Sequence, residues 1–230
     1  YDRVTGAENA IRFEQRLEAH KAQHLPYSIV AVNIHRFKFI NELHGSAGGD
    51  QVLRDLKAAI EEQIRPGEFF CRDAADLFYI MMEDTDEAVL RGRVEQLTTA
   101  VRTAWQKHYG GGVALYCGVT VGGDRVQALL AMQSIQASMQ TEISFYDAKV
   151  HAEERRKCQI ENTMQLALDQ EQYELFLQPK FRLDTGALAG AEALVRWRKP
   201  DGTYRYPNEF IPLFEETGFC TQLDLYMMDQ

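Results

Sequence analysis

The apolar residues between positions 1 and 147 recur alternately at helical and at strand spacing. Phe13 and Leu17 lie four residues apart and predict a helix, which a capping box at Thr5-Gly6-Ala7-Glu8 opens and Pro26 ends. Residues 27–34 are rich in β-branched side chains and predict a buried strand. The same patterns then predict a helix over about 50–64, two strands within 68–82 around a polar tip at 73–76, a helix over about 85–105, a strand over 113–121, a helix over about 126–140 and a short strand over 143–146.

A hairpin inside such an alternation of helices and strands favours an α/β sandwich with a mainly antiparallel sheet over a doubly wound parallel one. Residues 148–170 predict a long polar helix, which we interpret as a connector between domains. Two strands follow, over 173–181 and 188–197, and then a helix that starts near Pro207. Two strands and a helix cannot close a core, so the second domain is expected to be cut short. The predicted regions are residues 1–147, 148–172 and 173–230.

The composition, with 45% apolar and 26% charged residues, is that of an ordinary globular protein. The net charge of −9 argues against a polymer nucleic-acid partner but does not exclude a small nucleotide. No apolar run approaches the roughly 20 residues of a membrane span, so we expect no direct membrane contact from this segment. Four scattered cysteines indicate reduced thiols and a cytoplasmic location, or the cytoplasmic part of a membrane-anchored sensor. The start at Tyr1 instead of Met indicates a fragment.

The densest group of polar residues runs from Asn33 to Asn41 and continues at Gly49-Asp50. It lies at a strand end and before a helix, where α/β folds bind phosphates and bases. Asn41 and Asp50 suit a guanine edge, because a carboxylate accepts from N1–H and N2–H and an amide both donates and accepts. Lys38 suits a phosphate. Alternatively, Asn41 and Asp50 are only turn and helix-cap residues.

Residues 2–146 resemble the GGDEF domain of diguanylate cyclases, which join two GTP molecules into cyclic di-GMP. The matching residues are Asp2-x-x-Thr5-Gly6-x-x-Asn9, then Phe37-Lys38-x-x-Asn41 with Gly45 and Gly49-Asp50, then Ala74-Ala75-Asp76-Leu77-Phe78. The resemblance implies a GGDEF-type α/β sandwich with a central, mainly antiparallel sheet. It also implies that Lys38, Asn41 and Asp50 are the nucleotide-binding residues.

The family's name motif, Gly-Gly-Asp/Glu-Glu-Phe, reads Ala-Ala-Asp-Leu-Phe here. The Cβ atoms of Ala74 and Ala75 narrow the approach of a nucleotide and restrict φ. The resemblance implies that cyclases bind Mg²⁺ through carboxylates at the positions of Asp76 and Asn33. The amide of Asn33 removes one fixed charge, so Asp76 is expected to be a vestigial metal ligand. Further departures from the family pattern are Leu77 in place of a carboxylate, Met132 in place of an Asp and Met139 in place of a triphosphate-binding Lys.

These departures imply that the first domain is catalytically inactive as a cyclase. Two roles stay open for it: binding GTP as a regulatory ligand through Asn41 and Asp50, or acting only as a scaffold and homodimerisation unit. Arg65-Pro66-Gly67-Glu68 lies where many family members carry an Arg-x-x-Asp inhibitory site for cyclic di-GMP. Glu68 departs from that pattern by one methylene, and the alternative is a plain helix-end arginine.

Residues 173–230 resemble the opening of an EAL domain, a cyclic di-GMP phosphodiesterase with a TIM-barrel-like fold. The matching residues are Gln178-Pro179, Glu192-Ala193-Leu194-Val195-Arg196-Trp197 and Pro207-x-x-Phe210-Ile211-Pro212-x-x-Glu215-x-x-Gly218. The resemblance implies that Glu192 binds the catalytic Mg²⁺ or Mn²⁺ and that Gln178, Leu194 and Arg196 contact substrate. Alternatively, Arg196 forms a strand-end salt bridge and Gln178 a turn hydrogen bond. Trp197 is expected in the core.

Metal-assisted hydrolysis needs several converging carboxylates, and the family supplies the others from strands beyond Gln230. This segment alone is therefore expected to be inactive. The leading hypothesis is a bacterial cyclic di-GMP signalling protein whose complete EAL domain hydrolyses cyclic di-GMP to linear pGpG. The alternative is a non-catalytic receptor or scaffold that relays cyclic di-GMP or GTP binding to a partner, and a live cyclase is the least favoured reading.

Overall fold

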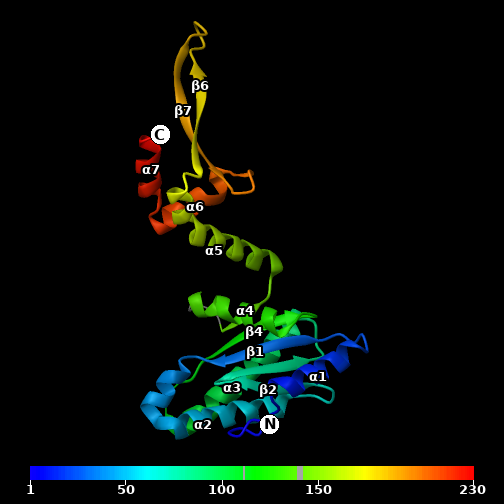
Figure 1. Cartoon of the computed structure of the whole chain (residues 1–230). Coiled ribbons are helices and arrows are strands. Elements are labelled where there is room, and N and C mark those ends of the chain that lie inside the picture. Colours follow the sequence, from blue (N-terminus) through cyan, green and yellow to red (C-terminus); the bar gives the residue numbers. More distant parts are fainter. Residues whose placement is uncertain (111, 139–141) are drawn as a thin grey trace. The chain divides into compact units, whose positions relative to one another are not determined.

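The computed structural model describes residues 1–110, 112–138 and 142–230, and the chain forms two compact units, Tyr1–Asp147 and Ala148–Gln230. Each unit has its own hydrophobic core. Figure 1 draws the helices and strands of both units. Within the described ranges, no helix is both long and apolar enough to cross a membrane. Met139 and the predicted helix end at residue 140 lie outside the described residues.

The first unit is built on a five-stranded sheet in the order β2-β3-β1-β4-β5. All neighbouring strands are antiparallel except β4 and β5, which are parallel, so the predicted mainly antiparallel sheet is confirmed. The strands are β1 (Ser28–Ile34), β2 (Phe69–Ala74), β3 (Leu77–Met82), β4 (Leu115–Val121) and β5 (Ile143–Phe145).

Four helices cover the two faces of this sheet: α1 (Ala10–Lys21), α2 (Phe37–Gln63), α3 (Glu87–Tyr109) and α4 (Arg125–Ser138). The alternation along β1 shows how the faces divide, because successive side chains of a strand point to opposite sides. Val30 and Val32 join the core that α2 and α3 cover, whereas Ile29 and Ala31 join the core beneath α1 and α4. Because β1 ends at Ile34 and α2 begins at Phe37, the end of this strand lies beside the start of this helix.

Two predicted helix starts are wrong in the first unit, and α1 also ends at Lys21, before the predicted end at Pro26. Helix α1 begins after Asn9, whose side chain accepts from the Arg12 N–H, and Thr5 instead donates its hydroxyl to Asp2. The predicted capping box is therefore not formed. Helix α2 begins at Phe37, not near residue 50, and it passes through the glycine-rich segment with a single non-helical residue, Gly45 (φ 68°, ψ 178°).

The second unit contains α5 (Ala148–Asp169), the antiparallel hairpin of β6 (Tyr173–Phe181) and β7 (Leu188–Arg198), the short β8 (Tyr204–Arg205), α6 (Pro207–Thr217) and α7 (Cys220–Met228). Tyr173 and Trp197 are cross-strand partners at the base of the hairpin and are buried, as predicted for Trp197. They pack with Phe210 and Phe214 of α6 and with residues of the C-terminal half of α5. The distal part of the hairpin is exposed, and its three-stranded sheet is not closed into a barrel within the described residues.

Candidate functional site

The tip of the β2–β3 hairpin lies beside the end of β1, because β3 pairs with β1. There the Asp76 carboxylate accepts the Ile34 backbone N–H at 3.1 Å. Burial raises the pKa of Asp76, although the Ile34 N–H, the Asn33 side chain and the Arg72 guanidinium each oppose that rise. The carboxylate is thus held by protein donors at the position where the resemblance implies a metal.

Asn33 and Asp76 do not form a fitting Mg²⁺ site. The ion prefers several charged oxygen ligands in octahedral geometry. Here the Asn33 amide is neutral and hydrogen-bonds to the Asp76 carboxylate, whose Oδ2 also accepts the Ile34 N–H. In the described part of the chain, no three side chains among His, Cys, Asp and Glu are grouped to hold a metal.

Ala75 takes a left-handed backbone conformation at the hairpin tip, with φ 50°. Arg72 fixes this turn: its Nε donates to the Ala75 carbonyl at 2.7 Å, and its Nη1 lies 2.8 Å from Asp2 Oδ1. Burial raises the pKa of Asp2, but the hydrogen bonds from Thr5 and Arg72 outweigh it and lower this pKa to about 2. The hairpin tip therefore has the positive φ angle that glycine adopts most easily, although alanine occupies this position.

Replacing Ala75 with glycine is expected to raise the free energy of unfolding by about 1 kcal/mol, because an L-residue is strained at positive φ. Ala74 is the matched control, since it ends a strand and is absent from the positive-φ residues. There Ala74→Gly should cost roughly 0.5–1 kcal/mol through chain entropy. Chemical denaturation measures both, and equal losses in the two variants would contradict the strained turn.

Asn41 and Gly49 are packed together although α2 is broken at Gly45 between them. A Cβ atom on Gly49 would overlap the Asn41 side-chain oxygen. Any residue other than glycine at this position would therefore displace the Asn41 amide. The Asn41 Nδ2 donates to the Phe37 carbonyl at 3.3 Å. The structure thus places Asn41 directly beside the residue that precedes Asp50, and both side chains are partly exposed. Lys38 is 86% exposed and lies 3.8 Å from Glu42.

The Arg65–Glu68 segment is not arranged as a ligand-binding pair. The Glu68 side chain has no exposed surface, and both its oxygens accept from Arg93 of α3, at 2.5 and 2.7 Å. Arg65 turns to Asp84 at 3.0 Å. Burial raises the pKa of Glu68, but the bonds from Arg93 and from two backbone N–H groups outweigh it and lower the pKa. These ion pairs within the protein favour the alternative interpretation of Arg65 as a plain helix-end arginine over an inhibitory site for cyclic di-GMP.

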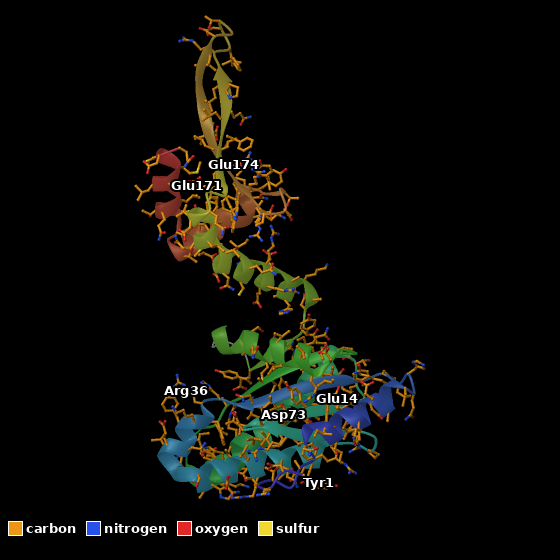
Figure 2. The ribbon with its side chains drawn as sticks, in the orientation of Figure 1. Tyr1, Glu14, Arg36, Asp73, Glu171 and Glu174 are labelled. Atoms are coloured by element: carbon orange, nitrogen blue, oxygen red, sulfur yellow. The ribbon has the colours of Figure 1, made fainter. Side chains whose placement is uncertain are left out.

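In the second unit, the strand register places all four predicted EAL residues on one face of the hairpin. Gln178 and Glu192 are direct cross-strand partners, and Leu194 and Arg196 follow Glu192 at alternate positions. Glu192 lies 2.9 Å from Lys180 Nζ, and this ion pair lowers the pKa of Glu192. Figure 2 labels Glu174, the cross-strand partner of Arg196 near the base of the hairpin.

Among the residues that the structure describes, Arg196 has no ion-pair partner, so the alternative interpretation as a strand-end salt bridge is not supported there. Its Nη1 donates to the Val195 carbonyl at 2.8 Å, and its guanidinium lies 5.9 Å from the ring centres of Phe176 and Tyr206. Phe176 and Lys180 belong to this face but were not predicted. Their spacing of two residues on either side of Gln178 is the strand signal that identifies them.

Comparisons with known proteins agree with these two units. Residues 1–154 match the family model "Diguanylate cyclase, GGDEF domain", and residues 161–230 match the EAL domain model. The bifunctional diguanylate cyclase/cyclic di-GMP phosphodiesterase MucR of Pseudomonas aeruginosa is 25% identical over all of this chain and 36% of its own length. The cyclic di-GMP phosphodiesterase NbdA of the same organism is 28% identical over 99% of this chain and 31% of its own length. The chain thus spans about a third of these relatives.

Solved structures show the same fold. The GGDEF domain of DgcB from Caulobacter crescentus, in complex with c-di-GMP, aligns with a TM-score of 0.56 at 17% identity, covering 63% of this chain and 94% of that one. The S helix-GGDEF-EAL region of Vibrio cholerae LapD, bound to c-di-GMP, aligns with a TM-score of 0.56 at 18% identity, covering 99% of this chain and 56% of that one. The chain belongs to the GGDEF domain family and continues into a segment of an EAL domain.

Proposed function

We propose that the chain is part of a cytoplasmic bacterial cyclic di-GMP signalling protein whose EAL domain hydrolyses cyclic di-GMP to linear pGpG. In this proposal the GGDEF domain makes no cyclic di-GMP. The observation that carries the loss of cyclase activity is the pairing of Asp76 with Asn33. The Asp76 carboxylate is hydrogen-bonded to the Ile34 N–H and to the Asn33 side chain, and this neutral Asn33 stands where a cyclase has its second carboxylate. Incubation with GTP and Mg²⁺ should accordingly yield no cyclic di-GMP.

The phosphodiesterase proposal rests on the shared face of Gln178, Glu192, Leu194 and Arg196. Glu192 would supply one ligand to Mg²⁺ or Mn²⁺, and the bound metal would polarise the phosphodiester and activate water. Arg196 is suited to hold a phosphate oxygen through its planar guanidinium. Leu194 and its cross-strand partner Phe176 offer an apolar surface to a guanine base. The described residues supply one carboxylate of this site, so the chain by itself should show no hydrolysis.

For the first domain we propose a GTP-binding regulatory role, supported by the packing of Asn41 against Gly49 beside Asp50. The competing role is a scaffold that forms a homodimer without nucleotide. The neutral Asn33 and the hydrogen-bonded Asp76 carboxylate favour this scaffold role, because they deprive the triphosphate of a metal partner. Binding of GTP decides between the two roles.

The substitution Gly49→Ala is expected to weaken GTP binding by about tenfold, because a Cβ there displaces the Asn41 amide from the base. Gly92→Ala is the control, since a Cβ on Gly92 of α3 meets open space. Isothermal titration calorimetry with GTP measures both variants. If the unmodified chain binds no GTP, the regulatory role fails and the scaffold role stands.

The receptor alternative keeps both domains as binding modules. It predicts that the complete protein binds cyclic di-GMP on the face of Glu192 but leaves it intact. Chromatography of cyclic di-GMP after incubation with the complete protein separates the two proposals. Appearance of linear pGpG excludes the receptor, and binding without turnover excludes the hydrolase.

A further inference from the structure

The first unit contains a pocket of about 470 Å³ that the candidate guanine site does not include. It lies between the start of α2, the C-terminal half of α3 and the residues before β4. The Trp105 side chain, only 2% exposed, forms part of its wall, whereas Phe39 and Leu43 are largely exposed. A concave, mostly apolar site of this size is typical of small-molecule binding.

The pocket lies on a different face of α2 from the guanine candidates. Phe39, Ile40, Leu43 and His44 line it, in a spacing that places them on one side of the helix. Asn41 is instead packed against Gly49. A ligand in this pocket would therefore leave the Asn41 amide undisturbed.

All ionisable side chains among the described lining residues are basic types: His35, Arg36, His44 and Arg102. This contrasts with the chain as a whole, whose net charge is −9. Arg36, seen at the start of α2 in Figure 2, forms no ion pair with the residues that the structure describes. His35 uses Nδ1 for the Tyr116 hydroxyl at 3.2 Å, so Nε2 is the ring nitrogen that a ligand can contact.

Arg102 has a competing partner outside the pocket lining. Its Nη2 lies 2.8 Å from Glu142 Oε1, and both side chains are about half exposed. An exposed pair of this kind contributes little to stability, so an anion in the pocket can take the guanidinium from Glu142 at small cost. The Glu142 carboxylate would thus compete with an anionic ligand for the Arg102 guanidinium.

We propose that this pocket binds a small aromatic anion, with its ring over the exposed side chains of Phe39 and Leu43, beside the buried Trp105, and its anionic group between Arg36 and Arg102. Burial of the ring supplies an apolar contribution, and the two guanidinium groups select a phosphate or a carboxylate. The site is separate from the proposed GTP site and does not depend on it.

Phenyl phosphate is the probe, followed by NMR through the indole N–H signals of Trp105 and Trp197, the two tryptophans of the chain. The Trp105 signal should shift on titration, and the Trp197 signal should not. Arg36→Gln and Arg102→Gln should each weaken binding by about tenfold, because each removes a charge-assisted hydrogen bond. Glu142→Gln should tighten binding about twofold to threefold, since it frees Arg102 from an exposed ion pair.

Arg91→Gln is the matched control for Arg102→Gln, because Arg91 lies on the same helix, is 44% exposed and pairs with Glu87 at 2.8 Å. It should leave binding unchanged, as should Asp50→Ala in the guanine candidate site. Neutral benzyl alcohol should bind at least several times more weakly than phenyl phosphate. An unmoved Trp105 signal, an equal loss in Arg91→Gln, or weaker binding in Glu142→Gln would overturn the proposal.

Discussion

Arg93→Met is expected to lower the free energy of unfolding of the first unit by about 3–5 kcal/mol, the range for breaking one side of a buried ion pair. Arg93 donates to both oxygens of Glu68 and also reaches Asp84 at 2.8 Å and the Gln63 carbonyl at 2.7 Å. Methionine leaves the Glu68 carboxylate buried and without its cation. Chemical denaturation at neutral pH measures the loss.

The pH dependence of stability should change sign in this variant. In the unmodified protein the pKa of Glu68 is lowered, so its contribution is complete above the ordinary value of 4.5 and is lost as the pH falls below it. Without Arg93, burial raises the pKa of Glu68 above its unfolded value. Acidification toward that raised pKa should then stabilise the Arg93→Met variant.

Two further variants keep this prediction sharp. Adding Glu68→Gln to Arg93→Met should recover part of the lost stability, because it removes the unpaired charge. Arg91→Met, on an exposed face of the same helix, should change stability by less than about 0.5 kcal/mol. A loss in Arg93→Met no larger than in Arg91→Met would contradict the structural role of the buried pair.

The second large effect concerns Glu192 in the complete protein. Glu192→Gln is expected to lower the rate of cyclic di-GMP hydrolysis by at least about 100-fold, because it would remove the charged metal ligand that we propose at Glu192. Binding of cyclic di-GMP should persist, since Gln178, Leu194 and Arg196 keep their shared face. The rate is measured by chromatography of linear pGpG, and binding by calorimetry with Ca²⁺ in place of Mg²⁺.

Asp184→Asn is the matched control, because Asp184 is an exposed carboxylate in the turn of the same hairpin. It should leave the hydrolysis rate unchanged. Lys180→Ala should preserve hydrolysis, since it only releases the Glu192 carboxylate from its ion pair. A Glu192→Gln variant that hydrolyses cyclic di-GMP at the unmodified rate would remove Glu192 from the metal site.

Local patterns predicted the sheet well, because the side chains of a strand point alternately to the two faces of the sheet and leave a period of two residues in the sequence. The same rule places Glu192, Leu194 and Arg196 on one face of β7, and it also identifies Phe176 and Lys180. The start of α2 was not predictable in this way. Glycine disfavours helix locally, yet Phe37 and Ile40 pack against the core and extend the helix through the glycines.

Long-range polar partners were beyond the reach of sequence patterns. Glu68 precedes β2 and Arg93 lies in α3, 25 residues further along the chain, and nothing in their spacing indicates an ion pair. The same holds for Asp76 with the Ile34 N–H, 42 residues away, and for Arg102 with Glu142, 40 residues away. These contacts depend on how the elements pack and become visible only in three dimensions.

The central claim, a silent cyclase domain joined to a cyclic di-GMP hydrolase, is tested most directly in one reaction. The complete protein is incubated with cyclic di-GMP and Mg²⁺ or Mn²⁺, with and without GTP, and all nucleotides are separated by chromatography. The account predicts linear pGpG at a rate that rises with GTP, and no cyclic di-GMP from GTP alone. Cyclic di-GMP formed from GTP alone, or cyclic di-GMP left uncleaved, would contradict it.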